Sequence, residues 1–217
     1  MGPVQRCWDD LALRTGCDAP AAAATFAALL RAYGEPHRHY HTLDHVAALL
    51  VLLDRHADAG SDRDALILAI LFHDAIYDPS RQDNEAASAV FAAGHLTKLG
   101  FSEDRVGKVV RCILATCHGQ KAAPDDADVA LLLDLDLSIL AAPTDLYRSY
   151  AQAIRREYAH VPDALYRAGR GRVLEGFLAR DHIYLTERLR ALWEEPARAN
   201  LAAELTGLTT GAGPAEP

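Results

Sequence analysis

The amino-acid sequence predicts an all-α protein built as a single-domain helical bundle. Three observations lead to this prediction. Segments with the alternating pattern and β-branched or aromatic enrichment of strands are nearly absent. Apolar residues instead recur at helical spacing along most of the chain, and Gly, Pro and capping residues separate these segments. With 217 residues, 50% of them hydrophobic, the chain is long enough to bury one sizeable core.

Turn and capping residues place the helix ends in the first half of the chain. Gly34 and Pro36 end an Ala-rich segment, and Thr42 is expected to cap the next helix. Asp62 opens the helix with the longest apolar run. We expect Pro79 to end that helix near residue 77, because the residue before a proline disfavours helical backbone. The helices expected here cover residues 4–15, 20–33, 42–58, 62–77, 83–98 and 102–117.

The second half continues the helical pattern after the segment GQKAAPDD, which has the composition of a loop. Pro143 and Pro162 each lie at the start of an apolar-periodic segment, where proline is tolerated. The last residues, 206–217, are rich in Gly and Pro and are expected to be disordered. The helices expected here cover residues 126–141, 144–158, 162–181 and 183–205. One domain is therefore expected over residues 1–205, with no internal linker.

Charge and composition exclude several classes of protein. The net charge of −8 argues against a general surface for nucleic-acid polymers or for anionic membranes, and it leaves open a local basic cleft. No apolar run reaches the roughly 18 residues of a membrane span, and the N-terminus lacks the pattern of a secretory signal. The four cysteines form no Cys-x-x-Cys pair, which favours free thiols. We expect a cytoplasmic protein.

Charged residues inside apolar runs are the strongest sign of a functional site. Residues 65–79 read ALILAILFHDAIYDP, so His73 and Asp74 interrupt a long apolar segment. A buried carboxylate is costly unless it is paired or bound to a metal. His45 opens another apolar helix, and Asp134 and Asp136 interrupt the run LLLDLDLSIL. The two aspartates are two residues apart, so they cannot share a helix face.

Two histidines and two aspartates form a donor set that suits Mn²⁺, Fe²⁺, Co²⁺, Ni²⁺ or Zn²⁺. Helical bundles hold such ions between inward-facing side chains of different helices. We therefore expect His45, His73, Asp74 and Asp136 to bind a divalent ion, with Asp134 supporting a ligand or facing solvent. A lone histidine on an apolar face is usually a core residue, but that reading leaves the aspartates unexplained.

The order His45, His73–Asp74, Asp136 resembles the signature of the HD superfamily of metal-dependent phosphohydrolases. The resemblance covers about residues 38–140, and residues 150–190, within the C-terminal helices at 143–205, resemble the C-terminal part of a subgroup known only as predicted HD-type hydrolases. It implies an HD-type bundle that hydrolyses a phosphoester or phosphoanhydride with a metal-activated water. It also implies that the bound ion is Mn²⁺, with Mg²⁺ and the other divalent ions as alternatives. The implied substrate is a nucleotide or another small phosphorylated metabolite.

Resemblance also suggests roles for further residues. The segment YHTLDH is similar to one in cyclic-nucleotide phosphodiesterases, which implies that His41 protonates the leaving oxygen. Glu85 resembles an acidic position that orients the attacking water in some HD enzymes. His118 resembles an additional histidine that contacts phosphate or a second metal. The alternatives are a capping or solvated histidine for His41 and favourable helix-end charges for Glu85 and His118.

Phosphate binding requires cations, and Arg38, Lys121 and Arg155 are the candidates for binding the substrate. Each of them is also compatible with a solvated surface charge. Two other functions remain open on the same scaffold: a non-catalytic nucleotide- or metal-binding regulator, and an HD-type di-iron oxygenase, which would need additional histidine ligands. A homodimer is also left open.

Overall fold

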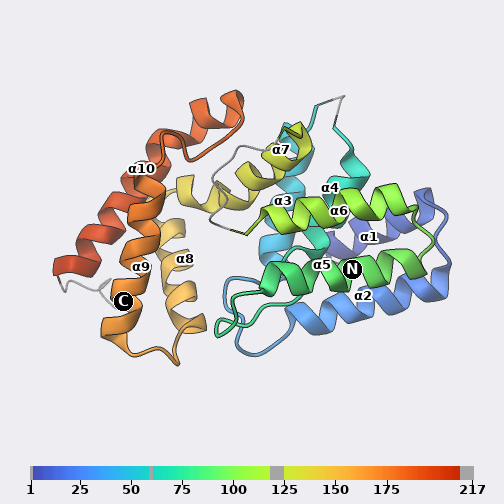
Figure 1. Ribbon diagram of the computed structural model, residues 1–217, viewed down its shortest axis with the longest axis horizontal. Helices are drawn as coiled ribbons and strands as arrows, with labels where there is room; N and C mark the ends of the chain where they lie inside the picture. The colour runs from blue at the N-terminus through green and yellow to red at the C-terminus, as the bar shows by residue number, and fades with distance from the viewer. Residues whose placement is uncertain (1, 59–60, 118–124, 211–217) are drawn as a thin grey trace. The chain divides into compact units, whose positions relative to one another are not determined.

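The computed structural model describes residues 2–58, 61–117 and 125–210 (Figure 1). These residues form ten α-helices and one short 3₁₀ helix, with no strand among them, which confirms the all-α prediction. No helix in the described ranges is both long and apolar enough to span a membrane. The chain divides into two compact units, residues 1–135 and 136–217. From the sequence, one domain was expected over residues 1–205, with a core at about residues 38–140 and further helices over 143–205.

The first unit is organised around α4. Eight consecutive residues of this helix, from Ala65 to Phe72, are buried, so it is apolar on every side and lies at the centre of the unit. It packs against α3, α5 and α6. The helices of this unit are α1 (Pro3–Arg14), α2 (Ala19–Tyr33), α3 (Leu43–His56), α4 (Arg63–Phe72), α5 (Asn84–Lys98), α6 (Glu103–Ala115) and α7 (Ala127–Asp136), whose last residue lies just past the boundary.

The second unit surrounds a separate core. Its helices are η1 (Leu137–Ala141), α8 (Thr144–Glu157), α9 (Asp163–Leu178) and α10 (Glu187–Thr210). Figure 1 shows α9 beside α10, and α10 also packs on η1. Tyr184, Leu174 and Leu201 are fully buried there. The Asn200 side chain donates hydrogen bonds of 2.8 Å to the carbonyls of Leu140 and Ala142, which fixes η1 against α10.

Most predicted helix starts are confirmed, whereas several helix ends differ. Thr42, Asp62 and Ser102 are N-caps whose side chains accept backbone N–H groups, as expected. The helix predicted over 126–141 changes to a 3₁₀ helix after residue 136. Residues 206–210 continue α10 rather than forming a disordered tail, and residues 211–217 lie outside the described range.

The fourth helix ends at Phe72 and not near residue 77, so the predicted boundary was wrong. His73 is the C-cap, and Asp74 lies in the turn that follows. Side chains hold the end of the helix and the turn: the His73 ring and the Tyr33 hydroxyl bond the carbonyls of Ile70 and Leu71, and Arg38 donates to those of residues 74 and 75. Tertiary contacts, and not Pro79, therefore end this helix and set the direction of the His-Asp pair.

The last helix begins late because Glu194 holds the preceding segment. Its carboxylate accepts the backbone N–H groups of Ile183 and Tyr184 at 3.0 and 3.2 Å, and Arg198 donates to it at 2.8 Å. Burial opposes ionisation, but these hydrogen bonds outweigh it and lower the pKa of Glu194. The carboxylate therefore stabilises the folded second unit.

The low pKa of Glu194 predicts a loss of stability in acid. The charged carboxylate contributes fully above its unfolded pKa of about 4.3, and the contribution is lost as the pH falls through the lower folded pKa. We expect the urea midpoint of the second unit to fall more steeply between pH 5 and pH 3 in the native protein than in Glu194→Gln. Glu195→Gln, an exposed neighbour, is the matched control and should keep the native pH dependence. Equal slopes for the native protein and Glu194→Gln would contradict the prediction.

Candidate metal centre

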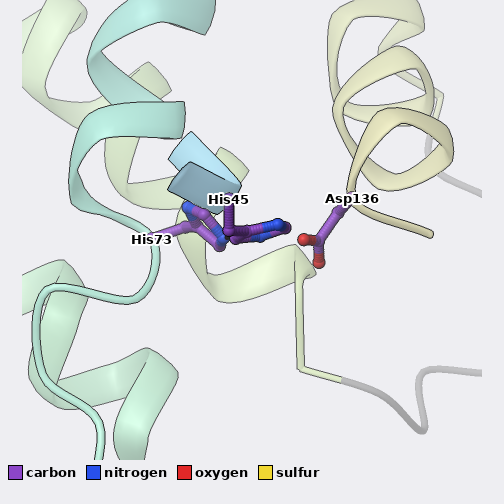
Figure 2. Close-up of side chains that lie close together, drawn as sticks. All are labelled: His45, His73 and Asp136. Carbon is purple, nitrogen blue, oxygen red and sulfur yellow. Dashed lines mark hydrogen bonds between the residues drawn. The ribbon is translucent and has the colours of Figure 1, made fainter. Parts of the chain in front are cut away.

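Three of the predicted ligands converge in the structure. His45 lies in the first turn of α3, His73 caps the end of α4, and Asp136 is the last residue of α7. One ligand atom of each lies within 4.8 Å of the ligand atoms of the other two. Figure 2 shows the carboxylate of Asp136 directed toward the two imidazole rings. This group could hold a metal ion.

The fourth predicted ligand, Asp74, lies beside the two histidines of this group. Its Oδ2 atom lies 3.0 Å from Nε2 of His73 and 3.9 Å from Nε2 of His45. The two Nε2 atoms are 3.2 Å apart. Nitrogen and oxygen ligands bound about 2.1 Å from one ion lie about 3.0–3.4 Å from their nearest neighbours. The 3.0 and 3.2 Å separations match this spacing, the 3.9 Å separation is wider, and the donor types suit a divalent ion.

The hydrogen bond of His73 prepares its ring for metal binding. Nδ1 lies 2.9 Å from the carbonyl oxygen of Ile70, which can only accept a hydrogen bond, so Nδ1 carries the proton. In the neutral ring this leaves the lone pair on Nε2, the atom that faces His45 and Asp74. Metal-binding histidines are commonly held in this way by a carbonyl or carboxylate on the other ring nitrogen. The ring is only 1% exposed, so its orientation is fixed by packing as well.

Asp134 is buried and does not face solvent. Only 1% of it is exposed, less than of the half-buried Asp136. Of the two alternatives for Asp134, the solvated one is therefore excluded. The two aspartates of LLLDLDLSIL therefore occupy different environments. Asp136 is the last residue of α7 and belongs to the group that could hold a metal ion, whereas Asp134 lies two residues earlier in the helix.

His41 lies next to the metal-ligand group but outside α3. The helix begins at Leu43, so His41 precedes the N-cap and shares no helix face with His45. Its ring centroid lies 6.2 Å from that of His45. The ring stacks on Tyr77, with the centroids 4.1 Å apart and an interplanar angle of 29°. This stacking holds a half-buried imidazole beside the candidate metal centre.

Two tyrosines near the site were missed in the sequence. The Tyr77 ring stacks on His41, and the Tyr40 ring lies 4.9 Å from that of His45. Neither has a spacing that distinguishes it from an ordinary aromatic residue. For Tyr40 the available signal was its position within the histidine-rich segment HRHYH, next to a proposed catalytic residue.

Glu85 lies on a helix whose first turns are anchored to the segment after the His-Asp pair. Asn84 accepts the N–H of Asp78 at 3.0 Å and donates to its carbonyl at 2.9 Å. Ser88 makes the equivalent pair of bonds with Ile76, at 3.0 and 3.1 Å. Glu85 lies between these anchors, is half-buried, and has no side-chain hydrogen bond or ion pair with another described residue.

Arg38 differs most from its predicted role. Its guanidinium is fully buried and donates to the Glu35 carboxylate and to three backbone carbonyls, those of residues 41, 74 and 75. At least four of its five N–H groups are used within the protein. The structure therefore directs this side chain into the backbone around the site and not toward a substrate phosphate.

The remaining predicted residues do not add to the described site. Arg155 belongs to the second unit, where it donates to the carbonyls of Tyr158 and Val161 and lies 4.6 Å from the centre of the Tyr166 ring. Those contacts stabilise the turn between α8 and α9. His118 and Lys121 lie outside the described residues.

Comparison with known proteins gave no match to a family model, to a curated protein or to a solved structure.

Proposed function

We propose that this protein is a divalent-metal-dependent phosphohydrolase of the HD type. The observation that carries the proposal is the convergence of His45, His73 and Asp136 from three separate helices, with Asp74 only 3.0 Å from His73. Their order along the chain supports the resemblance to the HD superfamily. Two imidazoles and two carboxylates leave coordination positions for water and a substrate oxygen on a six-coordinate ion.

The ion, when bound, supplies a Lewis acid for a phosphoryl oxygen and a nucleophilic water at neutral pH. The chain supplies the other functions. Tyr77 holds the His41 ring beside the ligands, where its imidazole can pass a proton to the departing oxygen. The anchored first turn of α5 holds Glu85, whose carboxylate can accept a hydrogen bond from the attacking water. Burial of His45 and His73 limits the access of bulk water.

The substrate class that fits this proposal is a nucleotide or another small phosphorylated metabolite. The chain carries a net charge of −8, and the cations first assigned to phosphate binding are committed elsewhere in the described structure or lie outside it. A metal ion would therefore supply most of the positive charge that a phosphoryl group needs. Mn²⁺ is the first ion to test, followed by Mg²⁺, Co²⁺ and Ni²⁺.

The proposal is tested by a hydrolysis screen with the full chain. Nucleoside mono-, di- and triphosphates, cyclic nucleotides and small phosphate esters are incubated with each ion, and phosphate and pyrophosphate release are measured. We expect turnover of at least one class that needs added metal and that falls at least about 100-fold in Asp74→Ala, because this change removes a direct ligand. His182→Ala, an exposed histidine of the second unit, should retain native activity.

Two outcomes would overturn the proposal. Full activity in Asp74→Ala would show that the reaction does not use this site. Tight binding of metal and nucleotide with no turnover of any compound would favour a non-catalytic regulator on the same scaffold.

A further inference from the structure

The burial of Arg38 is unusual for an arginine close to a metal-ligand group. None of its side chain is exposed, and arginine is almost never fully buried unless its charge is paired. Glu35, itself partly exposed, provides the counter-charge, with an N–O distance of 2.9 Å. The net charge of this ion pair is zero, so Arg38 adds little repulsion toward a cation bound nearby.

The guanidinium connects two segments that are far apart in the sequence. Nη1 donates to the carbonyl of His41 at 3.1 Å and to that of Asp74 at 2.7 Å, and Nη2 donates to that of Ala75 at 3.1 Å. One segment leads into His45, and the other contains His73 and Asp74. A single side chain therefore ties together the backbone of the two segments that supply three of the four proposed ligands.

Aromatic rings fix the plane of this guanidinium. Its central carbon lies 5.1 Å from the centroid of the Tyr33 ring and 5.4 Å from that of Tyr77. Cations at these distances from aromatic faces are attracted to them. The Tyr33 hydroxyl also donates to the carbonyl of Leu71 at 3.1 Å, so the same group of side chains holds the end of α4. Tyr77 contacts both Arg38 and His41.

The bonds explain how the turn after α4 keeps its shape. The last carbonyls of a helix have no partner within the helix, and they are costly when buried and unpaired. Here the His73 ring pairs the Ile70 carbonyl at the helix end, and Arg38 pairs the carbonyls of Asp74 and Ala75 in the turn that follows. If Arg38 is lost, the carbonyls of Asp74 and Ala75 lose these hydrogen bonds, so the turn can relax and Asp74 can rotate away from the two histidines.

We propose that Arg38 is a positioning residue for the metal centre: it holds the turn at residues 73–75 against residue 41 so that His45, His73 and Asp74 meet. This inference rests on the proposed metal-dependent function for its consequence, but not for the bonds themselves. Lysine should not replace Arg38, because an ammonium is a compact donor and cannot reach three carbonyls and a carboxylate with the fixed geometry of a guanidinium.

The test uses the full chain with Arg38→Lys and the milder Glu35→Gln, which leaves the arginine in place. Arg198→Lys is the matched control, because Arg198 also donates to backbone carbonyls, those of Leu178, Arg180 and Asp181, but in the second unit. Two quantities are measured: amide hydrogen exchange of the segment 73–77 in metal-free protein, and Co²⁺ affinity from the visible absorption of the bound ion.

We expect Arg38→Lys to accelerate exchange at residues 73–77 and to weaken Co²⁺ binding by about 10–100-fold, the usual loss when residues that support ligands are removed. Glu35→Gln should give a smaller change in the same direction. Arg198→Lys should leave both quantities at native values, although it lowers the overall stability of the second unit.

The possible failures are distinguishable. If amide exchange at residues 73–77 in Arg38→Lys is as slow as in the native protein, the positioning role is wrong, whatever the Co²⁺ affinity of the variant. Faster exchange with native Co²⁺ affinity would show that the turn is held by Arg38 but does not limit the ligands, which also overturns the inference. If the native protein itself binds no Co²⁺, the proposed metal-dependent function fails, and with it the role of Arg38 toward the metal.

Discussion

Replacing His73 with alanine should abolish tight divalent-metal binding. His73 is the central member of the group, because its Nε2 atom lies 3.2 Å from that of His45 and 3.0 Å from Oδ2 of Asp74. The Ile70 carbonyl fixes the ring proton on Nδ1. The substitution therefore removes a metal ligand, Nε2, that the fold has already oriented. Removal of residues that only support ligands costs about 10–100-fold in affinity, and we expect removal of this ligand to cost more than about 100-fold.

The measurement combines calorimetric titration with thermal unfolding. An ion present at 100 times its Kd stabilises the native protein by about 2.7 kcal/mol, so the native protein should melt at a higher temperature with metal than without it. His73→Ala should show no such shift. Hydrolysis in the proposed reaction should fall with the metal content.

A second histidine provides the control for this experiment. His95 is half-buried and bonds through Nδ1 to the Thr25 hydroxyl at 3.1 Å, outside the metal-ligand group. His95→Ala also loses an imidazole that packs inside the first unit, although a less buried one than His73, and it should retain the native metal-dependent shift. If His73→Ala binds metal as tightly as His95→Ala does, the candidate metal centre is wrong.

The candidate ligands could be singled out in the sequence, because His73, Asp74 and Asp136 interrupt apolar runs and His45 opens one. A charged or imidazole side chain in such a run has to be compensated by a partner, and a site that brings several together explains all of them at once. The same argument does not apply to Arg38. It lies in the polar segment EPHRHYH, where an arginine is usually solvated, and its burial depends on Tyr33 and on carbonyls of the distant residues 74 and 75.

The starts of most helices could be predicted from local sequence signals, whereas the ends of some helices could not. An N-cap such as Thr42 or Asp62 acts on backbone N–H groups two or three residues ahead, so its signal is local. The end of α4 depends on Arg38, which is 36 residues before Asp74. The start of α10 likewise depends on Glu194, which accepts N–H groups 10 and 11 residues before it. Contacts made only after folding override the local pattern.

The second unit contains a buried ion pair whose loss should have the largest effect on stability. Arg170 donates from Nε and Nη2 to the two carboxylate oxygens of Glu204, at 2.8 and 3.0 Å, and the Tyr147 hydroxyl donates to the same carboxylate. The side chains of Arg170 and Glu204 are only 9% and 12% exposed. Burial, followed by the charge of Glu204, raises the pKa of Tyr147 well above its ordinary value, so its hydroxyl stays protonated and keeps donating.

Glu204→Ala should lower the free energy of unfolding of the second unit by about 3–5 kcal/mol, because it leaves the Arg170 charge buried without a partner. Trp193 packs against the core of this unit and reports its unfolding by fluorescence. The only other tryptophan, Trp8, is removed by Trp8→Phe in every variant, so that urea titrations follow the second unit alone. Arg148→Ala, which breaks an exposed ion pair with Asp145, is the control and should change the midpoint little.

The pair itself is expected to contribute much less than the loss of one partner suggests. Replacing both charges with apolar residues removes the desolvation cost together with the attraction, so such replacements are often neutral or stabilising. Arg170→Met with Glu204→Leu, combined with Tyr147→Phe to remove the stranded hydroxyl, should therefore recover most of the stability that Glu204→Ala loses. If the triple variant is as unstable as Glu204→Ala, the cost lies in lost packing and not in the unpaired charge. If Glu204→Ala is as stable as Arg148→Ala, the ion pair does not hold α9 against α10.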